Sequence, residues 1–458
     1  MAEDSRGQEP VRILHVFGKL NRGGAESRVM DLYRHMDRGR VQFDFLVHYR
    51  VTKEDRKRLR QLLQEIKQGA KQETRQEARQ EAKKEAAADS GSACSRIGVF
   101  SEALYRLRPK EDLDDEVQAL GGRIYVLPRF TGTNLAQYRK ACRELFAAHH
   151  EFAAVEGHMT SMASVYLPIA KAAGVPVTIA HARSAGVDGG LRGVMTRVFR
   201  HSLSDRCDMM MSCSKEASAA VFGKKACESG RVMYVPNALE LSSFAYDPVK
   251  RRRMRERYNI PENALVVGHV GRLDPVKNHA YIAAVGKELQ RLGGREDVYY
   301  LFAGKGSLQG EIQEAFERAG LGERLIFAGQ LEREETAGIY QAFDVFVFPS
   351  LYEGLPGTVI EAQAAGLPCV ISDTITREVD VTELVRRLPL GEGNEHIWAA
   401  EVLRRTGQEE RDEKARARAS KEAGAALRDA GFDAAAAAVR LQELYLDCAD
   451  HCRTEGKR

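Results

Sequence analysis

The chain has 458 residues, which is too many for one compact core and favours two domains. The chain has 69 Lys and Arg residues and 65 Asp and Glu residues, a formal net charge of +4. Such a small positive charge gives no reason to expect a nucleic-acid partner. The eight cysteines form no CxxC motif or zinc-type cluster, the amino-terminal residues are polar, and no apolar run approaches the roughly 18 residues that span a bilayer. We therefore expect a soluble, cytoplasmic protein with reduced thiols.

Apolar runs and helix-like segments alternate through the first half of the chain. Residues 11–17 predict a buried strand, 18–24 a turn, and 25–36 a helix with apolar residues at helical spacing. Further strands are predicted at 41–49, 123–128, 152–157, 175–181, 208–214 and 231–236. Such alternation is typical of a parallel, doubly wound sheet.

Residues 51–117 interrupt this pattern as a charged insertion. Its centre, 71–86, is a four-residue repeat in which Lys or Arg, and likewise Glu, recur at every fourth position. On a helix each stripe would carry mostly like charges, so favourable i,i+4 pairs are largely absent. We expect a solvated, marginal helix or disorder. A basic arm that contacts lipid or a partner is the alternative, and the equal numbers of acids and bases disfavour it.

A second βα series follows a linker at residues 236–254. Its predicted strands are 264–271, 297–304, 324–329, 344–349 and 368–372. We predict an α/β fold of two Rossmann-like domains, residues 1–240 and 241–433, that face each other across a cleft. Residues 434–458 contain a last helix beyond the second series. In such sheets ligands bind outside the carboxyl ends of the strands.

Two carboxylates, Glu353 and Glu361, flank a Gly/Pro turn that leads from the strand at 344–349 into a helix. Backbone amides at residues 354–358 can hold an anion or a hydroxyl there, since a helix N-terminus carries free N–H groups. The pattern suits a ligand with hydroxyls and phosphates. A capping box from Thr358 is the alternative explanation for Glu361, but it does not account for Glu353.

Two cations, Arg272 and Lys277, follow the strand at 264–271. At a strand's carboxyl end they are well placed to clamp a diphosphate, although solvated surface charges are the alternative. Gly23 and Gly24 end the first turn without a GxGxxG pattern, so no dinucleotide fingerprint is supported.

Histidines follow two successive predicted strands, His158 after one and His181 at the end of the next, and both would point at the cleft. We expect no metal site, because the one acidic DxD-type pair, Asp112 and Asp114, lies inside the insertion and away from a strand end. A Walker-A motif and a GxSxG motif are both absent, which disfavours P-loop NTPases and serine hydrolases.

These motifs resemble a known family. The stretch from Pro349 to Ser372 is similar to the Glu-x7-Glu signature of GT-B retaining glycosyltransferases of the family 4 type, also described as group 1. VGRLDPVKNH resembles their diphosphate-binding loop and FGKLNRGGAES their glycine loop. The phrasing is especially similar to bacterial exopolysaccharide or capsule glycosyltransferases of the EpsF kind. The resemblance covers nearly the whole chain except residues 51–117.

The resemblance implies a nucleotide sugar, usually UDP-linked, as a substrate and no cofactor or bound metal. Its implied donor-binding residues are Gly23, Gly24, Arg272, Lys277, Glu353, Gly354, Leu355 and Glu361. Within this set, Glu353 would contact the sugar and Glu361 the ribose. The implied catalytic residues are His181, Glu353, Arg272 and Lys277. The enzyme would be a retaining hexosyl- or N-acetylhexosaminyl-transferase.

The resemblance also implies an acceptor, either a growing polysaccharide or a lipid-linked saccharide at the inner face of the cell membrane, and polysaccharide-assembly proteins as partners. The last helix would cross back to the first domain. Basic residues at 250–253, with Arg192, Arg197 and Arg200, could serve peripheral membrane contact or be ordinary solvated charge. Two alternatives stay open, a nucleotide-sugar epimerase on the same fold and a non-catalytic protein that binds sugar nucleotides.

Overall fold

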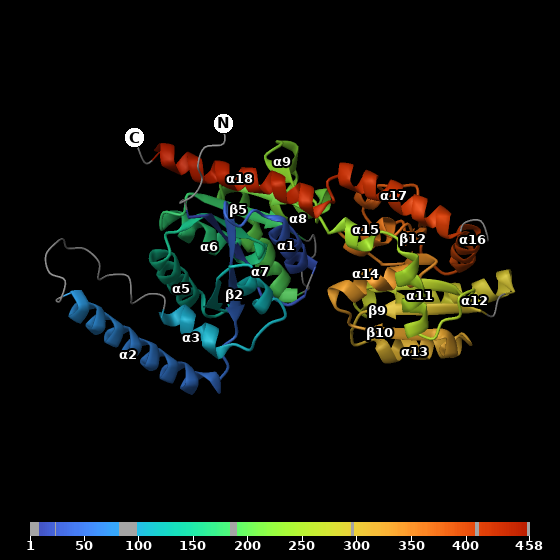
Figure 1. The fold of residues 1–458 in the computed structure, drawn as a ribbon, viewed down its shortest axis with the longest axis horizontal. Coiled ribbons are helices and arrows are strands. Elements are labelled where there is room, and N and C mark those ends of the chain that lie inside the picture. The colour runs from blue at the N-terminus through green and yellow to red at the C-terminus, as the bar shows by residue number, and fades with distance from the viewer. Residues whose placement is uncertain are drawn as a thin grey trace. The chain divides into compact units, whose positions relative to one another are not determined.

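A computed structural model gives the fold, which Figure 1 draws as a ribbon. It describes residues 9–22, 24–81, 99–183, 190–294, 297–407 and 412–455. The chain forms two compact units. The N-terminal unit is Met1–Val235 with Ala438–Arg458, and the C-terminal unit is Pro236–Ala437. These limits lie within a few residues of the domain ends expected from the sequence.

The N-terminal unit is built on a seven-stranded parallel sheet in the order β3-β2-β1-β4-β5-β6-β7. The strands are β1 Val11–Val16, β2 Val41–Tyr49, β3 Ile124–Pro128, β4 Phe152–Gly157, β5 Val177–Ala182, β6 Met209–Ser212 and β7 Val232–Tyr234. All seven were predicted from their apolar runs. The strand order reverses between β1 and β4, and a crevice forms at such a point outside the carboxyl ends.

Helices pack on this sheet through apolar faces and bury side chains such as Tyr138, Phe146 and Tyr166. The helices of this unit are α1 Gly24–His35, α2 Asp55–Glu81, α3 Val99–Leu107, α4 Asp114–Ala119, α5 Leu135–Ala148, α6 Thr160–Ala172, α7 Gly190–His201, α8 Lys215–Phe222 and α9 Lys224–Glu228, with a 3-10 turn at Leu203–Asp205. Helix α2 is the exception to this packing, since it lies mainly against α3.

Only part of residues 51–117, the stretch predicted as an insertion, lies outside the body of the N-terminal unit. Helix α2 takes in residues 71–81 of the charged repeat, and the rest of the repeat lies outside the described residues. Helices α3 and α4, by contrast, belong to the body of the unit, since Leu104 and Val117 are fully buried. They provide the crossover that two neighbouring parallel strands, β2 and β3, require. Their charged residues hid this role from the sequence pattern.

The C-terminal unit holds a six-stranded parallel sheet in the order β10-β9-β8-β11-β12-β13. The strands are β8 Leu265–Val270, β9 Val298–Ala303, β10 Leu325–Gly329, β11 Val345–Phe348, β12 Cys369–Ser372 and β13 Val385–Leu388. Here the order reverses between β8 and β11. Only β13 escaped prediction, because its sequence VRRL carries two arginines and it forms the sheet's edge.

The helices of this unit pack around two apolar clusters that contain Phe346 and Trp398. They are α10 Leu241–Phe244, α11 Pro248–Arg257, α12 His279–Gly293, α13 Gln309–Arg318, α14 Arg333–Ala342, α15 Gly357–Ala364, α16 Glu395–Arg405 and α17 Glu413–Asp429. Short 3-10 turns lie at Pro275–Lys277, Gly322–Arg324 and Arg377–Val379.

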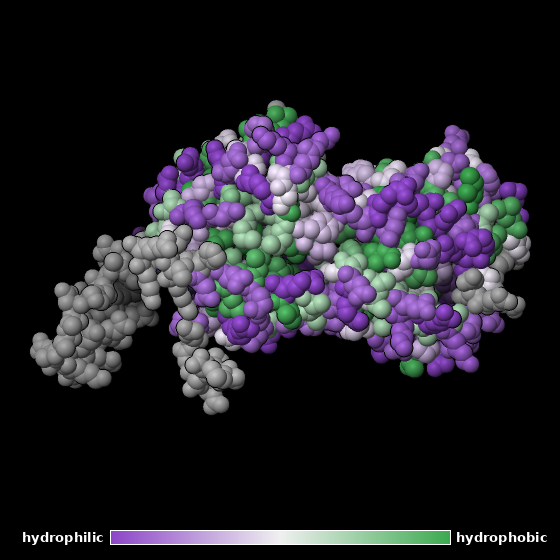
Figure 2. Space-filling view, turned by 90° about the horizontal axis from the view of Figure 1, so that it is seen from above, coloured by the Kyte–Doolittle hydropathy of each residue, from purple (hydrophilic) through white to green (hydrophobic). Residues whose placement is uncertain are grey.

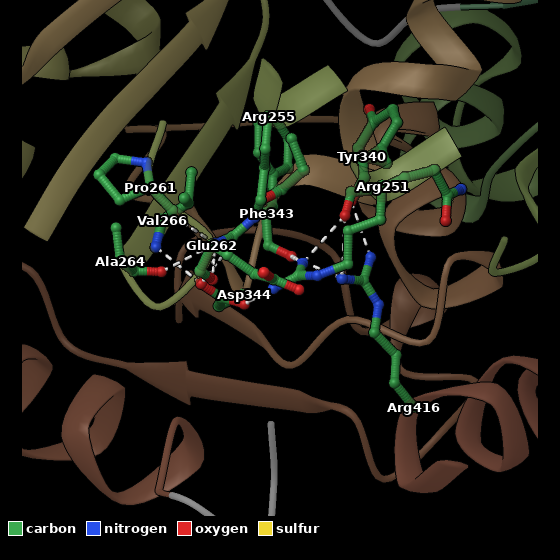
Figure 3. Close-up of polar contacts among 12 residues, drawn as sticks. Arg251, Arg255, Pro261, Glu262, Ala264, Val266, Tyr340, Phe343, Asp344 and Arg416 are labelled. Atoms are coloured by element: carbon green, nitrogen blue, oxygen red, sulfur yellow. Dashed lines mark hydrogen bonds and ion pairs between the residues drawn. The ribbon is translucent and has the colours of Figure 1, made fainter. Parts of the chain in front are cut away.

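A buried carboxylate, Asp344, binds two arginines just before β11 (Figure 3). Arg251 Nη2 lies 2.5 Å from Asp344 Oδ1, and Arg255 Nη2 lies 2.7 Å from Oδ2. Arg416 from α17 donates nearby to the carbonyls of Tyr340 and Phe343, at 2.8 and 2.6 Å. Arg251 therefore points inward, which corrects the expectation that it belongs to a surface basic patch.

The last helix, α18 Ala434–Glu455, leaves the C-terminal unit and packs on the N-terminal one. Gln442 Oε1 accepts a hydrogen bond of 2.8 Å from the Asp37 amide at the end of α1. Tyr445 is fully buried in the N-terminal unit.

The face of the molecule drawn in Figure 2 is mixed in hydropathy, with hydrophobic side chains in small groups between hydrophilic ones. In the described part of the chain no helix is both long and apolar enough to cross a membrane.

Candidate functional site

The cation loop and the acidic loop of the C-terminal unit meet at its topological switch point. Arg272 and Lys277 follow β8, and Glu353 follows β11, the two strands between which the order reverses. The loops are tied together by a backbone hydrogen bond of 2.8 Å from Leu351 N to Val276 O. The structure thus brings these three predicted residues to the sheet edge at which ligands bind.

Lys277 and Glu353 form a partly buried ion pair. Lys277 Nζ lies 2.5 Å from Glu353 Oε1, and the two side chains are only 13% and 19% exposed. The ammonium also lies over the ring of Phe348, 4.5 Å from its centroid. Arg272 differs, since its side chain is 84% exposed and its guanidinium lies 3.1 Å from Asp274. One cation is therefore held in place, and the other extends into solvent.

Glycines let the backbone pack tightly under this loop. A Cβ at Gly304, whose φ is +138°, would lie 1.9 Å from the carbonyl oxygen of Gly271. A Cβ at Gly306 would lie 2.1 Å from that of Leu273. These glycines allow the loop after β9 to support the loop that carries Arg272, and this is a structural role.

Helix α15 begins at the end of the acidic loop. Its N-cap is Pro356 without a side-chain cap, so Thr358 lies inside the helix and the capping-box alternative does not describe Glu361. Glu361 is buried, and its Oε2 accepts a hydrogen bond of 2.7 Å from Tyr340. Gly354 and Leu355 lie in the turn before the helix, where free amides favour an anion.

His181 lies in the N-terminal unit, at the end of β5, and its side chain is 1% exposed. Its Nδ1 is 2.7 Å from Oε1 of Glu156 in β4. Tyr445 of α18 donates a 2.5 Å hydrogen bond to the other carboxylate oxygen of Glu156. His181 Nε2 is buried and has no hydrogen-bond partner in the described structure.

His158, at the end of β4, and His15, in β1, complete this cluster. His158 Nε2 lies 3.1 Å from His15 Nδ1, and His158 Nδ1 accepts a 3.3 Å hydrogen bond from Arg183 Nε. Burial lowers the pKa of His15 and of His181 to about 4, and it lowers that of His158 well below its ordinary value. The three imidazoles are therefore neutral near pH 7.

Glu156 keeps its charge in this setting. Burial opposes its ionisation, but the hydrogen bond from His181 and the electrostatic interactions with the surrounding imidazoles outweigh burial, so the pKa of Glu156 lies well below its ordinary value. β1 and β4 flank the switch point of their sheet, so this cluster occupies the same topological position as the Lys277–Glu353 pair does in its own unit.

The predicted glycine loop is only partly visible. Gly23 lies outside the described residues, and Gly24 begins α1, with open space where a Cβ would stand. The loop before it is held by two acidic side chains that lie just before α4, since Glu111 accepts from the Leu20 amide at 2.6 Å and Asp112 from the Arg22 amide at 3.1 Å. Asp112, one of the DxD-type acidic pair, therefore has a structural role.

Within the described residues one group could supply ligands to a metal ion, namely His15, Glu156 and His158, whose ligand atoms all lie within 4.8 Å of one another. The Glu156 carboxylate, His15 Nδ1 and both ring nitrogens of His158 already take part in the hydrogen bonds given above. The sequence reasoning passed over Glu156, His15 and Tyr445. The available signal was a single charged residue inside the apolar strand 152–157, one position before a Gly-His pair.

Comparison with known sequences identifies relatives of the chain. The profile of the family described as "Glycosyl transferases group 1" matches residues 250–422. The putative glycosyltransferase EpsF of Bacillus subtilis (strain 168) is 32% identical over 397 residues, which cover 86% of this chain and 87% of that protein. The UDP-Gal:alpha-D-GlcNAc-diphosphoundecaprenol alpha-1,3-galactosyltransferase of Escherichia coli is 27% identical over 209 residues, or 44% of this chain and 53% of its own.

Solved structures share the fold. Anabaena Alr3699/HepE in complex with UDP has a TM-score of 0.66 at 14% sequence identity, and the match covers 96% of this chain and all of that one. Sucrose-phosphate synthase from Thermosynechococcus elongatus has a TM-score of 0.62 at 16% identity, with 96% and 99% coverage. The two parallel α/β units therefore form the GT-B fold predicted from the sequence.

Proposed function

Because the chain belongs to the group 1 glycosyltransferases and is itself a glycosyltransferase, we propose that it transfers a hexosyl or N-acetylhexosaminyl group from a UDP-linked donor with retention of configuration. The observation that carries the proposal is the Lys277–Glu353 pair at the switch point of the C-terminal unit. Membership of the family also favours transfer over the epimerase alternative.

Arg272 and Lys277 supply positive charge to the diphosphate leaving group. Lys277 is preorganised by Glu353 and Phe348, so little reorganisation is needed when the anion arrives. The amino end of α15 adds unpaired amides on the same edge of the sheet. Negative charge develops on the departing phosphate, and fixed positive groups of this kind stabilise it.

The acidic loop binds the sugar and the ribose of the donor. Glu353 has a second oxygen for a sugar hydroxyl while its Oε1 holds Lys277. Glu361 accepts from the ribose hydroxyls and shares its carboxylate with Tyr340, which already donates to it. Both acids serve as hydrogen-bond acceptors, and the departing phosphate takes the acceptor's proton. The reaction then needs no bound metal and no protein nucleophile.

The acceptor is a saccharide, and we propose that it is carried on a lipid. One relative is named for an undecaprenyl-linked acceptor, and α7 of this chain exposes an apolar stripe of Val194, Met195 and Val198 beside Arg197. Such a helix suits a lipid surface with anionic headgroups. Flotation with anionic vesicles tests this contact: Val198→Glu should reduce binding, and unchanged binding would exclude α7.

Calorimetry with UDP in EDTA tests the donor site. Lys277→Ala should weaken UDP binding roughly 10- to 100-fold, because it removes a charge-assisted contact to the diphosphate. Lys287→Ala is the matched control, since it removes an exposed lysine on α12. An unchanged affinity in Lys277→Ala would reject the assigned diphosphate contact, and a strict need for divalent metal would reject the metal-free reaction.

The reaction is tested with UDP-sugars and membrane lipid extract. NMR of the anomeric proton in the product should show the configuration of the donor. An inverted product would contradict retention. A donor epimer formed without any acceptor would contradict transfer.

A further inference from the structure

The buried carboxylate of Glu156 dictates where His181 carries its proton. A carboxylate only accepts hydrogen bonds, so the 2.7 Å contact requires a proton on His181 Nδ1. A second proton, on Nε2, would be buried without an acceptor among the described residues, so Nε2 carries a lone pair. This Nε2 is the atom without a partner in the described structure.

The remaining groups of the cluster leave this assignment unchanged. Arg183 donates to His158 Nδ1, so a neutral His158 carries its proton on Nε2. This N–H donates a hydrogen bond to His15 Nδ1. His158 Nε2 is also 3.6 Å from Glu156 Oε1, and the rings of His158 and His181 are 5.4 Å apart. Glu156 therefore remains the partner of His181 Nδ1, and His158 pairs with His15 instead.

Tyr445 fixes the carboxylate from the opposite side. Its hydroxyl binds Glu156 Oε2, which leaves Oε1 for His181. Tyr445 is 289 positions away in sequence and lies on the helix that returns to the N-terminal unit. The chain Tyr445–Glu156–His181 therefore links the docking of α18 to the orientation of one imidazole.

We propose that Glu156 is a positioning residue: held by Tyr445, it keeps His181 in the Nδ1–H tautomer, so that Nε2 accepts a hydrogen bond from a hydroxyl of a bound sugar. The proposal rests on the sugar transfer proposed above, and it names the chemistry of the group that His181 takes. A hydroxyl satisfies Nε2, whereas a carboxylate or a carbonyl oxygen brings no proton to it.

Nitrogen-15 NMR of the full chain labelled at histidine reads the tautomer without any need for activity, and His181→Asn assigns the signal. The wild type should show Nδ1–H for His181 near pH 7, and Glu156→Gln should shift the signal towards the other tautomer or a mixture. Glu151→Gln is the control, because Glu151 holds His149 Nδ1 at 3.2 Å at the other end of β4. An Nε2–H signal in the wild type would overturn the proposal.

Kinetics separate positioning from folding. Glu156→Gln should lower kcat roughly 10- to 100-fold, the size expected when a charge-assisted hydrogen bond is lost, and should leave UDP affinity unchanged. Glu156→Asp should recover part of kcat, and Tyr445→Phe should lower it less. Equal losses in Glu151→Gln, or weaker UDP binding in proportion to kcat, would indicate a merely structural role.

The metal alternative is tested on the same protein. His15, Glu156 and His158 could instead hold Zn²⁺, which would take Glu156 away from His181. Zinc found in equimolar amount by elemental analysis, and lost in Glu156→Gln, would overturn the proposal. A wild type without UDP binding or transfer would defeat the proposed function but leave the tautomer measurement valid.

Discussion

Glu156 in the N-terminal unit and Asp344 in the C-terminal unit are both buried carboxylates at strand ends, yet their partners differ. Asp344 precedes β11 and binds arginines and a backbone amide, groups that stay charged or never titrate near neutral pH. Glu156 lies at the carboxyl end of β4 among neutral histidines, and two ring nitrogens nearby, His15 Nε2 and His181 Nε2, are unpartnered within the described structure.

On the proposal made above, Asp344 belongs to a cluster that holds the fold, and Glu156 belongs to one that takes part in the reaction. The arginines of α11 occupy the carboxylate of Asp344, and Arg416 of α17 binds the carbonyls of Tyr340 and Phe343 just before it (Figure 3). Histidines around Glu156 can change protonation or accept a ligand, and they stand on the edge of the sheet at which ligands bind. Three changes test the comparison, and they are given in order of expected effect.

Asp344→Asn should have the largest effect. It leaves the buried cations Arg251 and Arg255 without their counter-charge, which costs about 3–5 kcal/mol of unfolding free energy. Urea unfolding followed by the fluorescence of Trp398, the only tryptophan and a buried one in this unit, measures the loss. Asp380→Asn, which removes the more exposed partner of Arg387, is the control and should cost far less. Similar losses would break the comparison.

Acid should affect the N-terminal unit first. Burial lowers the pKa of His15, His48 and His181 to about 4 in the folded state, against an ordinary value of 6.5. Between those values the unfolded chain binds more protons, so stability falls as pH drops from about 6.5 to about 4. In the described C-terminal unit the same direction holds for two histidines, His269 and His279.

The measurement is a pH titration in urea followed by two probes. Far-UV circular dichroism reports both units, and the fluorescence of Trp398 reports the C-terminal one. We expect circular dichroism to lose signal at a higher pH than the fluorescence does. Coincident transitions would mean that the two units unfold together or that the buried histidines do not control acid stability.

The surface pair Arg40–Glu443 should matter least. It joins the start of β2 to α18 at 3.1 Å, but its side chains are 49% and 58% exposed. Glu443→Ala should change the unfolding free energy by roughly 0–1 kcal/mol. Chemical denaturation of Glu443→Ala and Gln442→Ala, measured side by side, tests this. Gln442 is buried and accepts from the amide at the end of α1, so Gln442→Ala should lower the unfolding free energy more than Glu443→Ala does. A larger loss in Glu443→Ala would show that surface charge docks α18.

The sequence alone determined the layered architecture and the position of the two loops that carry Lys277 and Glu353. Apolar runs predicted every strand except β13, because a buried parallel strand needs continuous apolar residues and an edge strand does not. The motifs around Lys277 and Glu353 were visible because each follows such a run directly. That the two side chains pair was beyond the sequence, since it depends on β8 and β11 being neighbours.

Only the tertiary structure decided which groups surround His181. Its partners come from β4 and α18, and no local pattern relates Tyr445 to Glu156 across 289 positions. The structure likewise turned Arg251 inward and made α3 and α4 part of the body of the N-terminal unit. Local periodicity specifies which elements form, whereas the burial of a charge depends on the groups that distant segments bring to it.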